Sequence, residues 1–319
     1  MNIDVRPLAL HDLPEADRIF RLAFGTFLGL REPLGFMGDA DLIGPRWRAA
    51  PAASLGAYVD GTTLVGSNVM ADWGSFGFFG PLTVLPAYWD KGVAKRLTAA
   101  TMERFEQWGT QQTGLFTFAH SAKHIGLYRK FGFRPQQLTP VMAKSVTPGA
   151  ADAGHASGRW STFSEVPTHV RPALLAACLG LTDAIQPGLD LRREIDAVWQ
   201  QRLGDTVFVH DDQELVAFGV CHLGAGSEAG SGAAYLKFGA ARPGPSAAAD
   251  FDRLLAACEA LASTRGVAQL MAGVNTARQD AHRIMRARGF QTVLEGLAMQ
   301  RPDLPGTHRP DCFVIDDWR

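Results

Sequence analysis

Two short segments of the chain, far apart in the sequence, end in the same way. GLYRKFGF closes on Gly132 and Phe133, and HRIMRARGF closes on Gly289 and Phe290, an offset of 157 positions. The segments before each of them alternate between strand-like and helix-like patterns in the same order. Such a repeat indicates two copies of one α/β unit. The length agrees, because 319 residues exceed the size at which one hydrophobic core usually stops growing.

The segment SVTPGAADAGHASG, from Ser145 to Gly158, separates the two copies. It is aperiodic, rich in small residues and contains Pro and Gly, as linkers between domains often do. We therefore predict a first domain at residues 1–147, a linker at 148–158, a second domain at 159–304 and a tail at 305–319. The predicted fold class is α/β, with a mixed sheet in each of two tandem domains.

Both copies are expected to alternate strands with helices. In the first copy, two β-rich runs flank Asp60 and Gly61, a pair that suits a tight hairpin because glycine tolerates positive φ. Next come the strand FGFFGPLTVL, a helix ending at Gly109, the strand GLFTFA, the helix IGLYRKF and the strand TPVMAKSV. The second copy repeats this order with the hairpin VFVHDDQELVAFGVC, the strand AYLKFGAA, the helix DFDRLLAACEALAS and the strand VAQLMAGV.

The charge balance argues against polyanionic partners. The formal net charge is −1, so no general field attracts nucleic acid or an anionic membrane. The first residues, MNIDVRPLALHDL, lack the apolar core of a secretion signal, and no run of about 18 apolar residues follows. We expect a cytoplasmic protein with no nucleic-acid partner and no membrane partner.

The cysteines are too dispersed for a disulfide framework or a metal site. Cys178, Cys221, Cys258 and Cys312 show neither CxxC spacing nor a paired histidine. We expect reduced, structural thiols and no bound metal.

The segment PAYWDKGVAKRL, from Pro86 to Leu97, has the features of an anion-binding turn. A strand ends at its start and a helix begins near Gly92, so several backbone N–H groups point at one spot with no earlier carbonyl to accept them. The helix dipole and the cations Lys91, Lys95 and Arg96 favour a phosphate or pyrophosphate there. An ordinary helix start with solvated lysines is an equally open interpretation of this segment alone. The pattern matches neither a dinucleotide fingerprint nor a P-loop.

This turn and a second motif, SAKHIGLYRKFGF, together resemble the GCN5-related N-acetyltransferase (GNAT) family. The resemblance covers most of residues 1–147. The second copy resembles the same fold more weakly, so the chain is similar to a tandem acetyltransferase with a degenerate second domain. The resemblance implies that acetyl-CoA, the cosubstrate, lies between the two central strands. Leu82, Thr83 and Val84 would line its pantetheine arm, and Lys91, Gly92, Val93, Ala94 and Lys95 would hold its diphosphate.

Four positions depart from the usual residues of the family. Trp89 stands where the turn commonly begins with Gln or Arg, and Asp90 adds an acid beside the expected anion. Most contacts of such a turn come from backbone N–H groups, which survive a change of side chain, so acetyl-CoA binding stays the prediction. Ser121 replaces a common Asn and His124 a common Ala. The Ser121 hydroxyl can still bond to the pantetheine arm.

The expected chemistry is direct attack of an amine on the thioester carbonyl. The enzyme must hold the two groups close, stabilise the oxyanion, take a proton from nitrogen and protonate the departing thiolate. By the resemblance Tyr128 is the general acid, although a core tyrosine on a short helix would look the same. His120 follows the strand GLFTFA and is the candidate general base. His124, a water relay, a backbone carbonyl and a purely structural histidine remain open alternatives.

The acceptor is a small-molecule amine that the sequence does not name. FGTFLGLREPLGF, from Phe24 to Phe36, follows the first helix where the family places acceptor-facing segments, and its phenylalanines could line a pocket or only pack in the core. Arg31 and Glu32 could orient an ionic substrate. The tail segment DCFVIDDWR could cover a groove between the domains through its apolar residues.

Two functions are open at this point. One is an N-acetyltransferase whose first domain is catalytic, and the other is a non-catalytic module that binds acetyl-CoA or a protein. The second copy is expected to be inert, because its turn ARPGPSAAAD contains Pro243 and Pro245, which lack the N–H groups of an anion nest, and retains Arg242 as its only cation. Met285 stands where the first copy has Tyr128 and cannot donate a proton. Whether the chain forms a homo-oligomer is left open.

Overall fold

The computed structural model describes residues 2–149 and 160–319 and contains one continuous mixed sheet. The predicted linker therefore falls almost entirely outside the described residues. Thirteen strands join this sheet, in the order β1-β2-β3-β4-β5-β12-β6-β11-β10-β9-β8-β7, with β13 added beside β10. Two pairs, β4 with β5 and β10 with β11, are parallel, and the other paired strands are antiparallel. The predicted α/β class and its mixed sheet are confirmed.

The elements of the first half follow the expected order. They are β1 (Ile3–Pro7), α1 (Leu13–Phe27), α2 (Ile43–Ala49), β2 (Ser54–Val59), β3 (Thr63–Trp73), β4 (Phe76–Val84), α3 (Val93–Trp108), β5 (Gln112–Phe118), α4 (Ala122–Arg129) and β6 (Arg134–Ser145). The predicted hairpin is confirmed, since Asp60 and Gly61 both adopt positive φ, 51° and 77°. Gly109 and Gly132 are left-handed where the helices before them end. The short helix α2 was not predicted.

The second half repeats that order. Its elements are β7 (Trp160–Thr162), α6 (Arg171–Ile185), α7 (Arg192–Gln200), β8 (Gly204–Asp211), β9 (Glu214–Gly224), β10 (Gly230–Ala241), α8 (Ala247–Thr264), β11 (Gln269–Gly273), α9 (Gln279–Ala287), β12 (Gln291–Arg301) and β13 (Val314–Asp316). The pair α6 and α7 corresponds to α1 and α2, α8 to α3, and α9 to α4. The duplicated arrangement inferred from the sequence is therefore present in the fold.

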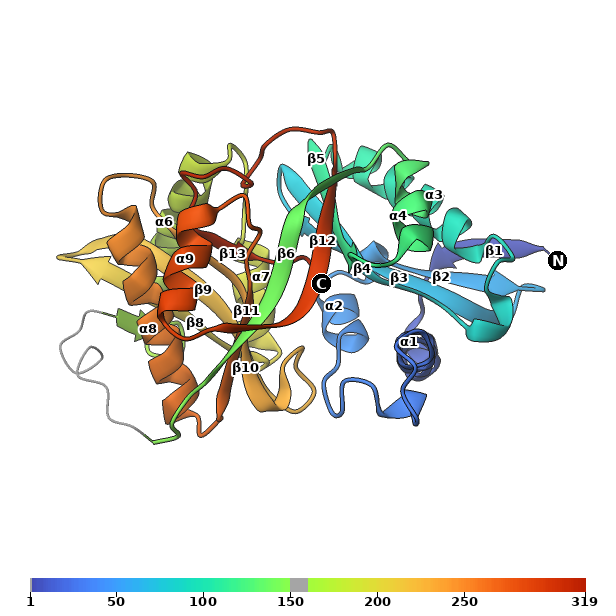
Figure 1. Ribbon diagram of the computed structural model, residues 1–319, viewed down its shortest axis with the longest axis horizontal. Helices are drawn as coiled ribbons and strands as arrows, with labels where there is room; N and C mark the ends of the chain where they lie inside the picture. Colours follow the sequence, from blue (N-terminus) through green and yellow to red (C-terminus); the bar gives the residue numbers. More distant parts are fainter. Residues whose placement is uncertain (1, 150–159) are drawn as a thin grey trace.

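The two halves exchange their closing strands. β12 of the second half pairs with β5 of the first, and β6 of the first half lies between β12 and β11. Figure 1 shows β6 and β12 side by side where the halves meet. Neither half therefore completes its sheet with its own chain, a feature that the sequence pattern did not indicate.

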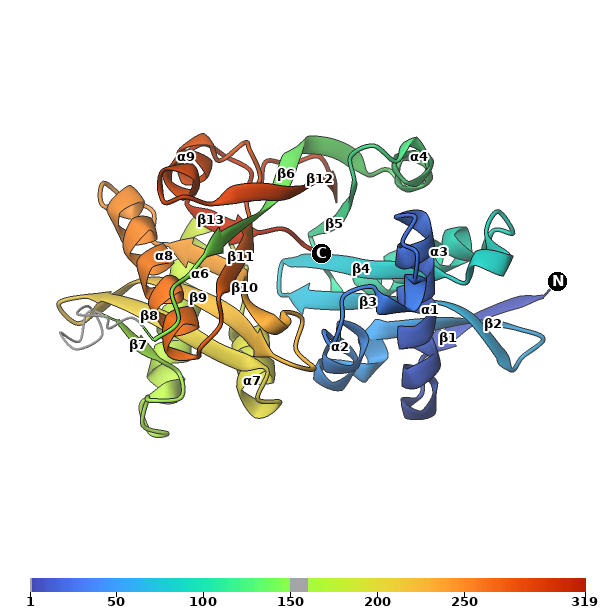
Figure 2. The same cartoon turned by 60° about the horizontal axis from the view of Figure 1, so that its bottom comes forward.

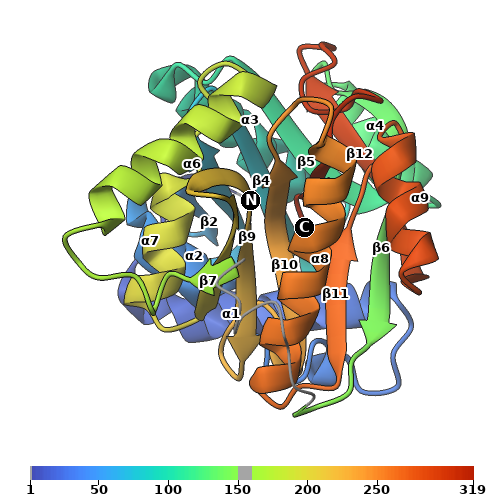
Figure 3. The same cartoon turned by 90° about the vertical axis from the view of Figure 1, so that its left-hand side faces the viewer.

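Helices cover both faces of the first half of the sheet (Figure 2). Leu64 and Val69 point into the core beneath α1 and α2, whereas their neighbours Val65 and Met70 point into the core beneath α3. This alternation is the period-two pattern of a strand that is buried on both faces. Figure 3 shows the same layering in the second half, with α6 and α7 on one side of the strands and α8 and α9 on the other.

A third core joins the halves. Trp73, Phe76 and Phe78 of the first half pack in one cluster with Leu181, Ile195 and Phe238 of the second. Across the described residues, none of the helices is both long and apolar enough to cross a membrane.

Candidate active site

The two central strands of the first half diverge. β4 and β5 pair from Phe76 with Gln112 as far as Phe79 with Leu115, and beyond that point β4 pairs only with β3 while β5 pairs only with β12. Gly80, the first residue after the last pair, has a φ of 143° that other residues rarely adopt. The divergence leaves a gap between the last residues of β4 and the last residues of β5.

Backbone groups of Leu82 and Val84 face this gap. The Leu85 N–H donates to the Val65 carbonyl of β3 over 2.8 Å. In an antiparallel pair, the backbone N–H and C=O groups of successive residues point alternately toward and away from the partner strand, so those of Thr83 also point toward β3. The backbone groups of Leu82 and Val84 therefore point away from β3. The Thr83 hydroxyl lies 2.9 Å from that of Ser67 and is buried. Of the three residues predicted to line a pantetheine arm, Thr83 therefore has its side chain and backbone engaged elsewhere.

Trp89 bonds to one of the backbone carbonyls of β4 that point away from β3. Its indole N–H donates to the Val84 carbonyl over 2.7 Å. The residue that departs from the family's Gln or Arg thus closes the turn onto the end of β4. The Leu82 backbone groups and the Val84 N–H remain available at the edge.

The turn after β4 ends in a cluster of free backbone donors. Gly92 has a φ of 82° and precedes the first residue of α3. The Arg96 N–H is the first of the helix to find a carbonyl, that of Gly92 at 3.2 Å. Within the described chain, the N–H groups of the four residues from 92 to 95 donate to no protein acceptor. Four converging donors at the positive end of a helix form an anion-binding site.

The charged side chains around the turn are accessible. Lys91 and Lys95 are exposed, whereas the Val93 side chain is buried in the core, so that only its backbone can reach a ligand. The Asp90 carboxylate forms an exposed ion pair with Lys123 over 2.6 Å. This pair offsets part of the negative charge that Asp90 adds beside the turn.

Tyr128 lies at the point of divergence. Its ring is 5.8 Å from that of Phe79, the last residue of β4 that pairs with β5. Burial raises the pKa of Tyr128, so the phenol stays protonated. Among the described residues its hydroxyl has no hydrogen-bond partner. The arrangement leaves one proton donor unused beside the gap.

Two histidines and Phe27 lie near the end of β5. The exposed His120 ring stacks on Phe27 with 5.8 Å between centroids, and the His124 ring lies 5.0 Å from Phe27. Burial, followed by the charges of Lys123 and His120, lowers the pKa of His124. The Ser121 hydroxyl accepts from the His124 N–H at 3.4 Å and caps α4, although its own proton remains available.

The aromatic segment after α1 meets the same strand end. Phe24 stacks on Phe36 at 5.4 Å and approaches Phe118, the last residue of β5, at 6.0 Å. Arg31 and Glu32 are exposed, and neither forms an ion pair with another described residue. The structure therefore brings the predicted acceptor-facing aromatics close to the gap and leaves the two charged residues outside it.

Comparison with known proteins identifies this half. A family model described as Acetyltransferase (GNAT) family matches residues 21–133, which include the diverging strands, the turn and α4. Residues 21–133 match the GNAT family. A search of curated protein sequences gave no match.

Solved structures share this fold over nearly the whole chain. A solved structure from Pyrococcus horikoshii superposes with a TM-score of 0.70 at 14% identity, over 99% of this chain and 95% of its own. A GCN5-related N-acetyltransferase from Sphaerobacter thermophilus gives 0.57 at 15% identity over 94% and 95%, and one from Anabaena variabilis gives 0.54 at 12% over 94% and 72%. At these identities the likeness shows the fold alone.

The GNAT-like cleft of the second half is filled by the chain itself. β10 and β11 pair only from Ala234 to Leu236 and then diverge as β4 and β5 do. β13 pairs with β10 inside this gap, with Ile315 opposite Gly239. Buried Arg278 holds the inserted segment by donating to the Val314 carbonyl over 2.7 Å and to Asp316. The tail that the sequence suggested as a groove cover is thus a strand within the second cleft.

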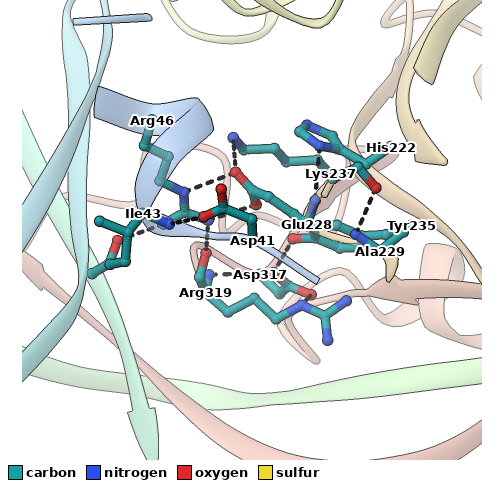
Figure 4. Close-up of polar contacts among 12 residues, drawn as sticks. Asp41, Ile43, Arg46, His222, Glu228, Ala229, Tyr235, Lys237, Asp317 and Arg319 are labelled. Carbon is teal, nitrogen blue, oxygen red and sulfur yellow. Dashed lines mark hydrogen bonds and ion pairs between the residues drawn. The ribbon is translucent and has the colours of Figure 1, made fainter. Parts of the chain in front are cut away.

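The two halves of the GNAT fold also share a buried charged cluster, which the sequence analysis missed. Arg46 from α2 donates to both carboxylate oxygens of Glu228, at 2.8 and 2.6 Å. Lys237 from β10 donates to Glu228 at 2.8 Å and to Glu194 at 2.7 Å. His222 from β9 lies beside them (Figure 4). We call these five residues the interface cluster. The available signals were a lysine inside the apolar strand AYLKFGAA and a histidine inside the strand that ends FGVCHLG.

Metal ligands are not part of this site. Over residues 2–149 and 160–319, no three His, Cys, Asp or Glu side chains gather in a way that could hold a metal ion. The four cysteines are free and buried.

Proposed function

We propose that the protein transfers an acetyl group from acetyl-CoA to the amine of a small molecule, in its first half. The observation that carries the proposal is one gap with an anion-binding turn at one end and an unused phenol at the other. Strand divergence after Phe79, the free N–H groups at 92–95 and the Tyr128 hydroxyl supply these three parts. The GNAT family match over residues 21–133 supports the same reaction class.

The gap suits the elongated shape of acetyl-CoA. The diphosphate would accept from the N–H groups of Gly92, Val93, Ala94 and Lys95, with the Lys91 and Lys95 side chains beside it. The pantetheine amides would pair with Leu82 and Val84 along the open edge of β4, as a further strand does in a sheet. Ser121 lies across the gap at the start of α4 and could donate its hydroxyl proton.

The proposed step needs few groups. The amine nitrogen forms a bond to the thioester carbonyl carbon, the carbon–sulfur bond breaks, and the Tyr128 proton passes to the departing thiolate. The Leu82 N–H, just past the point of divergence, is the donor we assign to the developing oxyanion. The nitrogen loses a proton to His120, to a water relay or to a backbone carbonyl. A protonated phenol matches the thiolate because burial raises the pKa of Tyr128.

We further propose that each chain binds one acetyl-CoA. In the second half β13 lies in the corresponding gap, and the turn contains Pro243 and Pro245. Met285 is fully buried where the first half has its phenol. We infer from the near-zero net charge that neither nucleic acid nor an anionic membrane takes part in the reaction.

One observation supports a second candidate function. Trp89 occupies the Val84 carbonyl and Asp90 places an acid beside the turn. Both changes would suit a module that binds acetyl-CoA without turning it over.

Thiol release from acetyl-CoA in the presence of a panel of small amines tests the proposal. We expect amine-dependent release by the wild type that is lost in Gly92→Val. Acetyl-CoA binding without release for any amine would favour the second candidate, and absence of binding would contradict both.

A further inference from the structure

A cavity of about 170 Å³ opens between α2 of the first half and α7 of the second, and both halves line it. Its floor is the interface cluster, and its walls include the small side chains of Ala49, Ala71 and Ala197. One ordered water needs only about 10–15 Å³ of such space, so the cavity is large enough for a small molecule.

The cavity is lined by charges of both signs in equal number. Arg46 and Lys237 are countered by Glu228 and Glu194, and at the mouth Arg193 is paired with Asp72. Burial raises the pKa of Glu194, but chiefly the charge of Lys237 holds that pKa at about 2, so this carboxylate stays ionised. A ligand that carries a net charge would meet no excess of the opposite charge in this cavity, whereas a dipolar ligand would find an oppositely charged side chain for each of its ends.

The cluster also contains an unused donor that points into the cavity. The His222 Nδ1 accepts from the Glu228 N–H at 3.4 Å, which leaves the ring proton on Nε2. That Nε2 is 3.7 Å from the nearest Glu194 oxygen, beyond hydrogen-bond distance, and has no partner among the described residues although His222 is only 1% exposed. Lys237, with two acceptors, has a third N–H to offer. Leaving a buried donor without a partner is unfavourable, so a ligand acceptor at this place would be favoured.

The acidic side chains supply the complementary group. Within the interface cluster, Glu194 has 12% of its side chain exposed and the other four residues 4% or less. At the mouth, Asp72 is 22% exposed and is paired with Arg193, which is 79% exposed. Asp72 and Glu194 are thus the more exposed carboxylates of the lining and the ones that an ammonium group could reach.

One side chain of the cavity wall reaches the point where β4 leaves β5. Arg46, which lines the cavity, also donates to the Gly80 carbonyl, at the residue where β4 leaves β5. It further donates to the backbone carbonyl of Arg319. One side chain thus connects the cavity, the point of strand divergence and the tail.

We propose that this cavity binds the acceptor, and that the acceptor is a small zwitterion that carries both an ammonium and a carboxylate, such as an α-amino acid. The carboxylate would accept from the His222 Nε2 and Lys237, and the ammonium would lie against Glu194 and Asp72 until one proton passes to solvent water and the neutral nitrogen attacks. This inference rests on the proposed function and gives its substrate class. It also assigns a role to the second half, which supplies four of the five residues of the interface cluster.

Calorimetric titration without acetyl-CoA tests the substrate class directly. The probes are L-alanine, ethylamine, which lacks the carboxylate, and propionate, which lacks the amine. We expect L-alanine to bind at least tenfold more tightly than either of the others. Equal binding of ethylamine, or no measurable binding of L-alanine, would overturn the proposal.

A matched pair of variants tests the place of binding. Ala197→Phe fills the cavity without altering a charge, and Ala248→Phe makes the same change at an exposed position of α8. We expect the first to weaken L-alanine binding at least tenfold while the second and the affinity for acetyl-CoA stay unchanged. His222→Leu, checked for an unchanged melting temperature, should weaken L-alanine binding without creating affinity for ethylamine.

The outcomes separate this inference from the proposed function. L-alanine binding that Ala197→Phe leaves intact would place the ligand elsewhere and overturn the cavity assignment. Binding of both L-alanine and acetyl-CoA with no thiol release would leave the cavity as a zwitterion site and contradict the proposed transfer reaction instead.

Discussion

Tyr128 has the two properties that a general acid requires, a retained proton and a hydroxyl with no other partner. Burial raises its pKa, and its ring is fixed against Phe79 at the point where the central strands diverge. A core tyrosine would use its hydroxyl in a hydrogen bond, as Tyr58 does with Asp12 and Tyr235 with Asp317. The unused hydroxyl therefore supports the proposed role of Tyr128 as the general acid.

Replacing Tyr128 with Phe removes this proton donor and almost no volume. We expect turnover to fall by about 10²-fold or more, with acetyl-CoA affinity nearly preserved, because general acids contribute about 10²–10⁴-fold. The measurement is steady-state thiol release with an active amine. Tyr88→Phe is the control, since it loses a hydroxyl near the turn but outside the gap. Full turnover in Tyr128→Phe would show that the role is wrong.

The direction of the Tyr128 pKa shift has a consequence for alkaline pH. A phenol ordinarily titrates near 10, and a raised pKa keeps the acid form at higher pH. We expect kcat to show no alkaline fall caused by this group below about pH 10. A descending limb with an apparent pKa well below this value, which disappears in Tyr128→Phe, would contradict the assignment.

The turn and helix α3 show how an element makes a binding site from its backbone. Gly92 takes a positive φ, and a Cβ added there would meet no protein atom within 4 Å. The space around it is open for a ligand. Gly109, at the other end of the same helix, shares the positive φ and the open surroundings.

Gly92→Val and Gly109→Val therefore impose the same kind of strain at opposite ends of α3. Both should lower the free energy of unfolding by about 1–2 kcal/mol, the cost of a left-handed non-glycine residue. Only Gly92→Val should weaken acetyl-CoA binding, by at least tenfold, because its side chain blocks the approach to the N–H groups. Calorimetry on both folded variants checks this. An equal effect of the two changes would indicate that helix stability, and not the turn, is responsible.

Local patterns predicted most elements but not their partners. The hairpin at Asp60 and Gly61, the helix that ends at Gly109 and the turn before α3 follow from residue types a few positions apart. The exchange of β6 and β12 does not follow from such patterns, because the residue pattern of a strand indicates which of its faces is buried but not which strand lies beside it. The helices α6 and α7 were also not predicted, and their apolar residues pack partly against Trp73, Phe76 and Phe78 of the other half, a contact that neither copy shows alone.

The interface cluster was missed for a similar reason. Arg46, Glu228 and Lys237 are single charges spread over some 190 positions, each of which appears alone in the sequence. Only the folded chain brings them within hydrogen-bond distance. A lysine or histidine within an apolar strand is the one local sign of such a cluster, because burying a charge is costly unless it is paired.

For the molecule as a whole, we expect the interface cluster to make the packing of the two halves against each other less stable at low pH. Burial and the charge of Glu228 act to raise the pKa of Glu194, but chiefly the charge of Lys237 depresses it from 4.5 to about 2. A depressed carboxyl pKa contributes stability that is full above the unfolded value and is lost as pH falls through the folded value. We expect the melting temperature to fall between about pH 4.5 and about pH 2.

The matched variant for this prediction is Glu194→Gln, which keeps the shape of the side chain and removes its titration. Its melting temperature should be lower than that of the wild type at neutral pH and should fall less steeply over the acid range. Differential scanning calorimetry at a series of pH values measures both. Parallel curves for the two proteins would mean that other carboxyl groups govern acid unfolding.

The most direct test of the account is the number of acetyl-CoA molecules that one chain binds. The first half has an open gap and a turn of free N–H groups, whereas β13 lies in the gap of the second. Titration calorimetry should give a stoichiometry near one for the wild type, lost in Gly92→Val and kept in Arg242→Ala and Met285→Leu. Two equivalent sites, or binding that survives Gly92→Val but fails in Arg242→Ala, would show that the active half has been assigned wrongly.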